Sequence, residues 1–415
     1  MNHTQETRGH VARFGTPRTI KTVQTPLVAT LALLAALITT SFITVITALP
    51  LSTPARADFR AGVEAYEKGD YETAFKEWEP LAMAGDAEAQ HNLATMIELG
   101  FVKASDPNQA FNYFEMAAEK GFAESQYFLG AIYQRGQGVS KDLKKSLFYY
   151  QAAANQGHSK SQHALGVYYI QNETTRQQLG VSYIKEAAQA GLPIAQVDLG
   201  LIYVNGILVE RDVALGSEWL HAAAKANLAE AQFNLGVLYE QGLGVTQDYG
   251  TAKTWYEMAA AQNHARAQHN IAGLYGNGHG VQQDFDLSFA FYARAANQGL
   301  ADAQYGIGMA YRHGRGVKMD MVAAIRWIRR AAEQGYAPAQ NSMGVAYRNG
   351  LGVEQNFSKA VKWYQLAADQ NYAFALVNLG YAYEHGEGVP INIKLADQYY
   401  ERAADQGVTG TPIHY

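Results

Sequence analysis

A glycine-rich run at residues 276–281, Gly-Asn-Gly-His-Gly-Val, is the segment that most resembles a ligand-binding motif. Phosphate-binding loops of this composition follow a β-strand and open a helix. No strand pattern precedes this run, and a Gly-x-Gly-Val turn recurs at the same place in other copies of a repeat described below. We therefore interpret the run as a structural turn with one extra glycine.

Twelve histidines and an absence of cysteine limit the chemistry available to this chain. Without cysteine there is no disulfide, no thiolate metal ligand and no thiol nucleophile. His91, His163 and His269 occupy one position of the repeat, but His163 and His269 are three repeats apart. That separation is too large for a shared ion, whose ligands lie about 2 Å away. The carboxylates are scattered, so we expect no catalytic residue, no metal site and no cofactor.

The overall composition excludes two broad classes of protein. Apolar residues make up 48% of the 415 residues, which excludes a disordered chain. The 33 basic and 38 acidic residues leave no basic footprint, so we expect no nucleic-acid partner. The length fits either two domains or one elongated solenoid.

The first 57 residues differ from the rest of the chain. Basic residues precede an uncharged stretch of 23 residues from Leu27 to Leu49, and Ala55-Arg56-Ala57 follows. This order is typical of a secretory signal, although the stretch is also long enough to span a bilayer. We predict that residues 1–57 are a signal peptide, cleaved after Ala57, or else an N-terminal membrane anchor. Both alternatives place the following residues outside the cytoplasm, in the periplasm or outside the cell, because the positive end stays inside.

From residue 87 onward the chain repeats itself. The four residues Ala87-Glu88-Ala89-Gln90 are the first of nine similar copies, the ninth of which ends at Leu376. The spacing is 36 residues in seven cases and 34 residues once, between Gln162 and Gln196. A repeat of this length indicates an array of small stacked units. We assign nine copies to residues 87–408, preceded by a related helix pair at 58–86 and followed by a C-terminal tail at 409–415.

Each copy predicts two helices with well-marked ends. Aspartate or asparagine opens the second helix, where its side chain can accept hydrogen bonds from the first turn. Glycine or asparagine follows the second helix, and these residues tolerate the left-handed conformation that ends a helix. The opening residues are Asp106, Asp142, Asp212, Asp248, Asp284, Asp320, Asn356 and Asn392, and the closing residues are Gly85, Gly121, Gly157, Gly191, Asn227, Asn263, Gly299, Gly335, Asn371 and Gly407.

The pattern A-x-A-Q-x-x-L-G-x-x-Y-x-x-G-x-G-V-x-x-D, ending in A-A-x-x-G, resembles the Sel1-like repeat, a relative of the tetratricopeptide repeat. The resemblance covers residues 87–408. It implies an all-α, right-handed solenoid of about ten helix-turn-helix units whose first helices line a concave face. The third copy departs from the pattern, because residues 170–176 replace the Gly-x-Gly-Val turn and the copy is two residues short. We expect the solenoid to bend or loosen there.

Relatives of this type serve as adaptors, as periplasmic regulators of sensor kinases and as bacterial surface proteins. Together with the N-terminal segment, the resemblance predicts an exported scaffold that binds a protein or peptide partner on its concave face, in envelope signalling or surface interactions. We expect this scaffold to be a monomer. The alternative is a cell-envelope enzyme or binder that acts on peptidoglycan or a β-lactam. Cysteine-rich relatives linked to β-lactams carry a disulfide in each repeat, which this chain cannot form.

The predicted partner-binding residues lie on the face of the first helices opposite the leucines, where the repeat is free to vary. Apolar residues at the centre and polar or arginine residues at the edges suit a protein partner. We predict that substitutions at Phe233, Tyr305 and Arg348 weaken partner capture without melting the fold. The full predicted set is Val197, Leu201, Phe233, Asn234, Val237, Asn270, Tyr305, Met309, Arg312, Asn341, Arg348, Asn378 and Tyr381.

Overall fold

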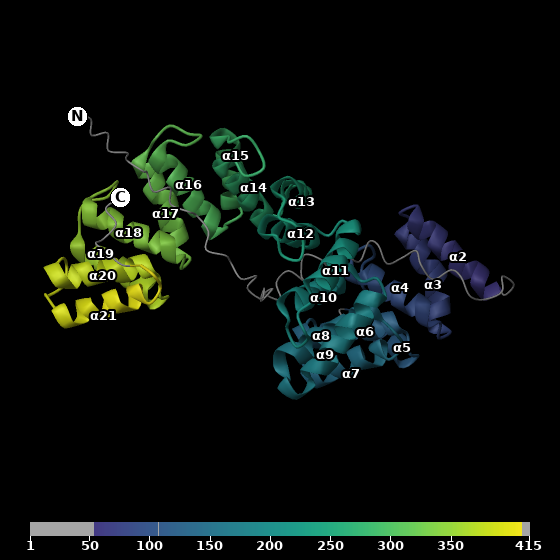
Figure 1. Cartoon of the computed structure of the whole chain (residues 1–415). Coiled ribbons are helices and arrows are strands. Elements are labelled where there is room, and N and C mark those ends of the chain that lie inside the picture. The colour runs from purple at the N-terminus through teal and green to yellow at the C-terminus, as the bar shows by residue number, and fades with distance from the viewer. Residues whose placement is uncertain (1–53, 107, 409–415) are drawn as a thin grey trace, which may run out of the picture. The chain divides into compact units, whose positions relative to one another are not determined.

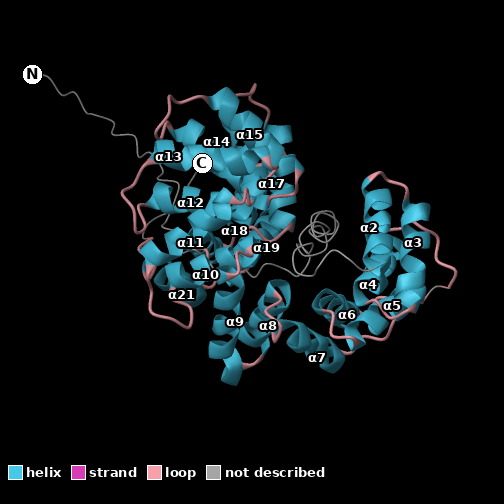
Figure 2. Cartoon of the chain, turned by 90° about the vertical axis from the view of Figure 1, so that its right-hand side faces the viewer, coloured by secondary structure: helices cyan, strands magenta, loops and turns pink. Residues whose placement is uncertain are grey.

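The computed structural model describes residues 54–106 and 108–408, and every regular element in these ranges is a helix (Figures 1 and 2). The predicted tail at 409–415 and all but the last four residues of the predicted N-terminal segment lie outside the described residues. Residues 54–57 begin the first described helix. None of the described helices combines the length and the apolar character that crossing a bilayer requires.

The chain divides into two compact units, residues 1–223 and 224–415. In the described part of the first unit, antiparallel helices follow one another in pairs. These helices are α2 (Pro54–Glu67), α3 (Tyr71–Met83), α4 (Ala87–Glu98), α5 (Gln109–Glu119), α6 (Ala123–Arg135), α7 (Leu143–Ala154), α8 (Ser159–Asn172), the short 3₁₀ helix η1 (Thr174–Arg176), α9 (Gln177–Gln189), α10 (Pro193–Asn205) and α11 (Val213–Lys225), which crosses the boundary.

The second unit continues the same arrangement. Each helix packs against the next along the chain, which confirms the predicted all-α solenoid. The helices are α12 (Ala229–Gln241), α13 (Tyr249–Ala261), α14 (Ala265–Asn277), α15 (Phe285–Asn297), α16 (Ala301–His313), α17 (Met321–Glu333), α18 (Ala337–Asn349), α19 (Phe357–Asp369), α20 (Ala373–His385) and α21 (Ile393–Ala404).

The predicted helix ends are confirmed with one exception. All ten closing glycines and asparagines have φ between 58° and 95°, the left-handed conformation that ends a helix. Seven of the eight opening residues accept a hydrogen bond from a backbone N–H in the first turn. Asp106 is the exception, because it accepts from the N–H of Asn108 at 2.6 Å and α5 begins only at Gln109.

The glycine after the repeated leucine lets the two helices of one copy approach each other closely. At Gly236, a Cβ atom would lie 2.5 Å from Cδ1 of Tyr256 on α13. Tyr256 is fully buried, so its ring could not move aside without opening the core. In the third copy, a Cβ on Gly166 would lie 2.9 Å from the carbonyl oxygen of Gly180. The backbones of α8 and α9 are therefore in close contact.

The third copy keeps this packing although its turn differs. The first helix extends to Asn172, and η1 then replaces the usual glycine turn before α9 begins. The expected loosening is not seen between α8 and α9, since the two helices approach as closely as helices in other copies.

The repeated glutamine has a structural role that the sequence pattern alone does not explain. Gln304 donates from Nε2 to the carbonyl oxygen of Ala296, which ends the preceding second helix, at 3.4 Å. Gln334, at the end of its own copy, donates to Oε1 of Gln304 at 2.8 Å. These two bonds tie three helix ends together, through the buried amide of Gln304 and the exposed amide of Gln334. The glutamine-to-glutamine bond recurs in the pairs Gln126–Gln156, Gln232–Gln262, Gln268–Gln298 and Gln340–Gln370.

Candidate functional site

Polar side chains connect the first helix of one copy to the first helix of the next. In the first unit, His91 meets Ser125 at 2.9 Å and His163 meets Asp198 at 2.8 Å. In the second unit, Asn378 donates from Nδ2 to Oδ1 of Asn341 at 2.8 Å. We call these contacts between consecutive first helices the polar seam. The seam occupies part of the face that the sequence analysis assigned to a partner.

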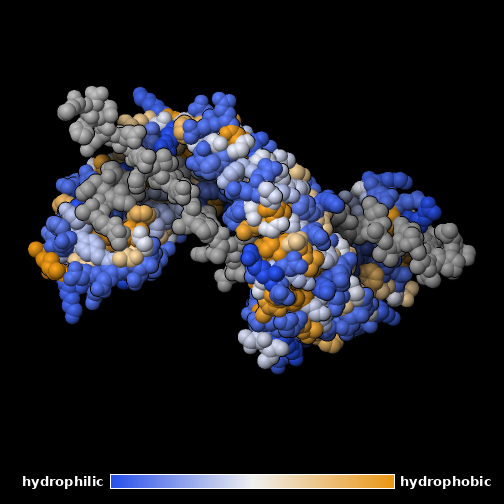
Figure 3. Space-filling view, in the orientation of Figure 1, coloured by the Kyte–Doolittle hydropathy of each residue, from blue (hydrophilic) through white to orange (hydrophobic). Residues whose placement is uncertain are grey.

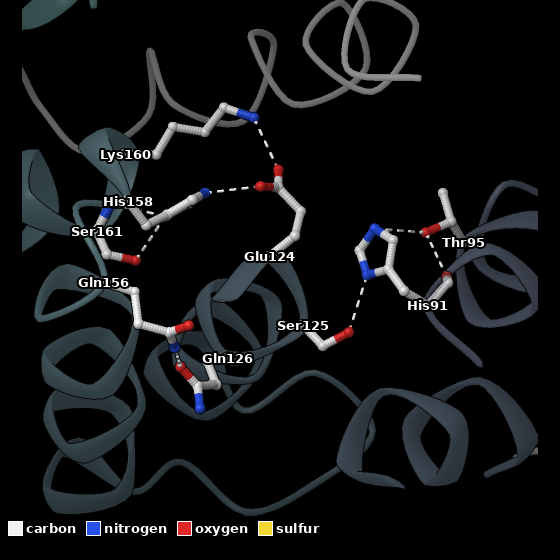
Figure 4. Close-up of polar contacts among 9 residues, drawn as sticks. All are labelled: His91, Thr95, Glu124, Ser125, Gln126, Gln156, His158, Lys160 and Ser161. Carbon is white, nitrogen blue, oxygen red and sulfur yellow. Dashed lines mark hydrogen bonds and ion pairs between the residues drawn. The ribbon is translucent and has the colours of Figure 1, made fainter. Parts of the chain in front are cut away.

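Glu124 is the centre of the seam contacts shown in Figure 4. Its carboxylate accepts hydrogen bonds from His158 Nε2 at 2.7 Å and from Lys160 Nζ at 3.1 Å. Burial alone would raise the pKa of the Glu124 carboxyl. The hydrogen bond from His158 and the positive charges of His158 and Lys160 outweigh burial and lower this pKa to about 2. Glu124 is therefore a charged group that fixes two neighbouring copies, with little freedom to act as an acid or base.

The second unit repeats this cluster. Glu230 accepts from His264 Nε2 at 2.9 Å, and Nδ1 of His264 accepts from the N–H of Ala267, which caps α14. Burial would raise the pKa of Glu230, but the hydrogen bond from His264 and the nearby positive charges lower it. Phe233 lies beside the cluster, with its ring centroid 4.8 Å from that of His264 and 4.4 Å from the Arg266 guanidinium.

Two serine–histidine pairs in the described residues match the geometry of a nucleophile and its base, His158–Ser161 and His91–Ser125, each with a hydroxyl 2.9 Å from Nδ1. Ser161 is completely buried, so the first pair is a structural contact beside Glu124. The second pair is His91–Ser125. Thr95 Oγ1 donates to the carbonyl oxygen of His91 at 2.9 Å and lies 3.5 Å from His91 Nε2. This arrangement favours a proton on Nε2, so that Nδ1 accepts from the Ser125 hydroxyl. The Ser125 side chain is completely buried, and the rings of Phe114, Phe122 and Phe128 surround the imidazole. A substrate cannot reach the pair, so it is a structural contact.

The buried imidazole of His91 predicts a loss of stability in mild acid. Burial lowers the pKa of His91 to about 4, well below its usual value. Between pH 6.5 and 4, the unfolded chain therefore binds a proton that the folded chain excludes, and stability falls as the pH decreases. The expected slope is about 1.4 kcal/mol per pH unit. Urea unfolding of the first unit, followed at several pH values, measures this slope.

The His91→Gln variant is the matched control for this titration. Glutamine can still hydrogen-bond with Ser125 but has no proton to gain, so the slope between pH 6.5 and 4 should decrease. The remaining acid sensitivity should appear below about pH 4.5, where the unfolded chain protonates carboxylates such as Glu124. Equal slopes for the two proteins between pH 6.5 and 4 would show that His91 is not the group responsible.

The structure buries six of the thirteen predicted partner-binding residues. Val197 and Phe233 are each only 2% exposed, and none of the thirteen is fully exposed. The prediction that these six face a partner is therefore corrected, because their side chains are buried within the helix array; Phe233, for example, packs on Tyr256 and His264. The six residues are Val197, Phe233, Asn234, Val237, Asn341 and Asn378.

Arg348 and Tyr381 lie together, but their polar groups already have partners. The Arg348 guanidinium donates to both carboxylate oxygens of Glu387, at 2.6 and 3.3 Å, and lies 4.3 Å from the centre of the Tyr381 ring. The Tyr381 ring stacks on His385 with a centroid distance of 3.9 Å. Arg348 thus connects two copies. A partner would have to compete with Glu387 for it.

The remaining five predicted residues are partly buried. Leu201 lies on α10 in the first unit, and Asn270 donates to the Tyr256 hydroxyl at 2.9 Å. Tyr305 lies 3.3 Å from the Ser342 hydroxyl, and Met309 packs against a neighbouring hydrophobic cluster. Arg312 lines a small hollow together with Ile325 and Ser342. This hollow has room for about one water molecule, which is too small for a substrate. Whether any of the thirteen contacts a partner stays a prediction.

The described residues contain no cluster of three or more histidine, aspartate or glutamate side chains that could hold a metal ion. The surface in Figure 3 is mostly hydrophilic, with apolar residues in scattered groups. The geometry of the described part therefore favours binding through surface residues over chemistry in a cavity.

A model described as the Sel1 repeat matches eight segments of the sequence: residues 87–122, 123–158, 193–228, 229–264, 265–300, 301–336, 337–372 and 373–408. The chain belongs to the Sel1 repeat family. The segment between the second and third matches is the shortened copy, whose missing glycine turn accounts for the lack of a match. A comparison with curated proteins found no match.

Two solved Sel1-type structures are similar to this chain. One is c5321, a protective antigen present in uropathogenic Escherichia coli strains, with a TM-score of 0.62 and 28% identity over 80% of each chain. The other is a Sel1 repeat protein from Oxalobacter formigenes, with a TM-score of 0.54 and 29% identity, covering 58% of this chain and 96% of that chain.

Sequence reasoning missed the polar seam, although a signal for it was present. Glu124 and Glu230 occupy one repeat position, and His158 and His264 follow each of them by 34 residues. A basic residue, Lys160 or Arg266, comes two positions later. A search for residue pairs one repeat apart would have identified both clusters as contacts between copies.

Proposed function

We propose that this Sel1 repeat protein is an exported scaffold that binds a protein or peptide partner through side chains on several consecutive copies. The observation that carries the proposal is the succession of Sel1 repeats over most of the chain. Repeat arrays of this kind present extended surfaces, and their individual units contain no deep pocket. The partly buried side chains of the first helices, such as Tyr305 and Tyr381, remain candidates for contact.

Export is the second part of the proposal. Residues 1–57 support export, because a basic segment is followed by an uncharged stretch and then by Ala-x-Ala. We favour cleavage of this segment over its retention as a membrane anchor. Among the similar structures, the E. coli protein is described as a protective antigen, and recognition of an antigen by the immune system is compatible with exposure outside the cytoplasm. The periplasm or the cell surface is therefore the proposed location, with envelope signalling or surface contact as the context.

A cell-envelope enzyme acting on peptidoglycan or a β-lactam is the alternative function. It needs an accessible nucleophile with a base, or a metal. In the described residues the serines of both serine–histidine pairs, Ser125 and Ser161, are completely buried, and the hollow beside Arg312 is too small for such a substrate. The scaffold is therefore the better-supported function.

Capture of a partner from the bacterial envelope tests the proposal. The exported protein, purified with an affinity tag, should retain one protein after cross-linking, and that protein should bind again when purified separately. The same preparation should release no product from peptidoglycan or from a chromogenic β-lactam. N-terminal sequencing of the exported form should begin at Asp58. Enzyme-like turnover without any retained protein would contradict the scaffold function.

A further inference from the structure

The outer face of α17 carries an exposed row of side chains. Val322, Arg326 and Arg330 are four residues apart, so they lie along one side of the helix, and all three are exposed. Val322 is 56% exposed, unusual for a branched apolar side chain. The Arg330 guanidinium lies 4.6 Å from the centre of the Trp327 ring, which holds it against the helix.

The next second helix, α19, presents side chains of the same kind at equivalent positions. Lys362 follows Arg326 by one repeat of 36 residues, and Leu366 follows Arg330 by the same spacing. Both are exposed, Leu366 to 47%. Gln370, which follows α19, donates to the carbonyl oxygen of Gly335, which follows α17, at 2.9 Å, so the ends of the two helices adjoin. We call Val322, Arg326, Arg330, Lys362 and Leu366 the outer basic patch.

The cations of this patch differ from equivalent cations on neighbouring helices. Arg294 on α15 and Arg402 on α21 each donate to a carbonyl oxygen at the end of the preceding second helix, at 3.5 and 3.3 Å. Among the described residues, no ion pair includes a cation of the outer basic patch. Their charges are therefore available to an external anion.

The charge of the patch contrasts with that of the chain. The copy at residues 301–336 contains six basic and three acidic residues, whereas the whole chain contains 33 basic and 38 acidic residues. A net negative protein is repelled by an anionic bilayer, and a patch of three cations and two aliphatic side chains is small for membrane binding. A short acidic peptide is small enough to contact only the positively charged patch, so the net negative charge of the rest of the protein repels it less than it repels a bilayer.

We propose that the outer basic patch binds an acidic peptide segment of a protein partner, with carboxylates on Arg326, Arg330 and Lys362 and separate aliphatic side chains on Val322 and Leu366. This inference rests on the proposed scaffold function and specifies the chemistry of its partner. It also places a contact surface on the second helices, outside the thirteen residues predicted from the sequence.

Fluorescence anisotropy with a defined probe tests the patch on the full exported protein. The probe is a fluorescein-labelled peptide of repeated Glu-Glu-Leu triplets, and its control contains glutamine in place of glutamate. The protein should bind the acidic peptide and not its control, with affinity that decreases as salt increases. The double variant Arg326→Glu/Lys362→Glu should lower the affinity by about tenfold or more.

The double variant Lys103→Glu/Lys144→Glu is the matched control, because both lysines are exposed and the change in net charge is identical. It should change the affinity by less than about twofold, and circular dichroism should show both variants folded. Equal weakening in both variants, or no peptide binding, would overturn the patch. The proposal would also be overturned if the peptide did not bind and the patch were instead required for binding to phosphatidylglycerol vesicles or for self-association.

The envelope capture experiment separates this inference from the scaffold function. A partner retained equally by the wild type and by the Arg326→Glu/Lys362→Glu variant would overturn the patch and leave the scaffold intact. Failure to retain any protein would contradict the scaffold itself, even if the acidic peptide bound.

Discussion

Replacing Phe233 with alanine is expected to destabilise the second unit by about 3–5 kcal/mol, the range for removal of a buried aromatic ring. The side chain is 2% exposed and packs between Tyr256, His264 and the Arg266 guanidinium. Removing the ring leaves a cavity and loosens the cluster around Glu230. The variant should therefore unfold at a lower urea concentration than the wild type, as followed by circular dichroism.

Met258→Ala is the matched control, since this apolar side chain on the same unit is 42% exposed. Its stability should stay within about 0.5 kcal/mol of the wild type. Unchanged urea unfolding of the Phe233 variant would contradict the burial described above. The result also affects experimental design. Loss of partner capture by this variant would also report unfolding, so the burial of Phe233 argues against the sequence-based expectation that it can be changed without melting the fold.

Replacing Gly316 with alanine is expected to cost about 3 kcal/mol or more. Gly316 has φ of +68°, and its turn packs against the start of α15, the second helix of the preceding copy. A Cβ atom on Gly316 would overlap the carbonyl oxygen of Phe285 in that helix. The left-handed conformation costs alanine about 1–2 kcal/mol, and the displacement of packed backbone adds a further penalty. Because the clash lies between two copies, the variant should separate neighbouring copies as well as lower the urea midpoint.

Gly314→Ala isolates the contact between copies from the conformational penalty. Gly314 lies in the same turn with φ of +65°, but the nearest atom to its Cβ would be Cβ of Met319 at 3.5 Å. This variant should lose only about 1–2 kcal/mol. Hydrogen exchange should show increased opening of α15 in the Gly316 variant and not in the Gly314 variant. Equal losses would mean that the turn does not depend on stacking against the preceding copy.

Local signals explain why the sequence predicted the fold well. Helix ends depend on residues such as Asn227 and Gly299, whose conformational preferences act without reference to distant parts of the chain. Nine similar copies also reinforce one another, so an irregular turn such as residues 170–176 does not obscure the helix pairs. Asp106 deviates because its side chain bonds two residues ahead and delays the start of α5.

The candidate site was harder to predict because it depends on contacts one repeat apart. Variation along the first helices was interpreted as freedom from packing, yet Phe233 packs on His264, which caps the first helix of the next copy, and Asn341 accepts a hydrogen bond from Asn378, one copy further along. Periodicity within one helix shows which residues share a face. It does not show whether the next copy covers that face, which explains why six predicted contact residues are buried.

If this chain binds a protein through exposed side chains of several copies, then the bound partner should shield those copies from solvent. Hydrogen–deuterium exchange of the exported protein, with and without its purified partner, measures this shielding. We expect protection on at least two consecutive copies when the protein partner is added, and none with a muropeptide or a β-lactam. Binding through several copies would be contradicted if a muropeptide or a β-lactam protected a single segment of the chain and no envelope protein changed the exchange.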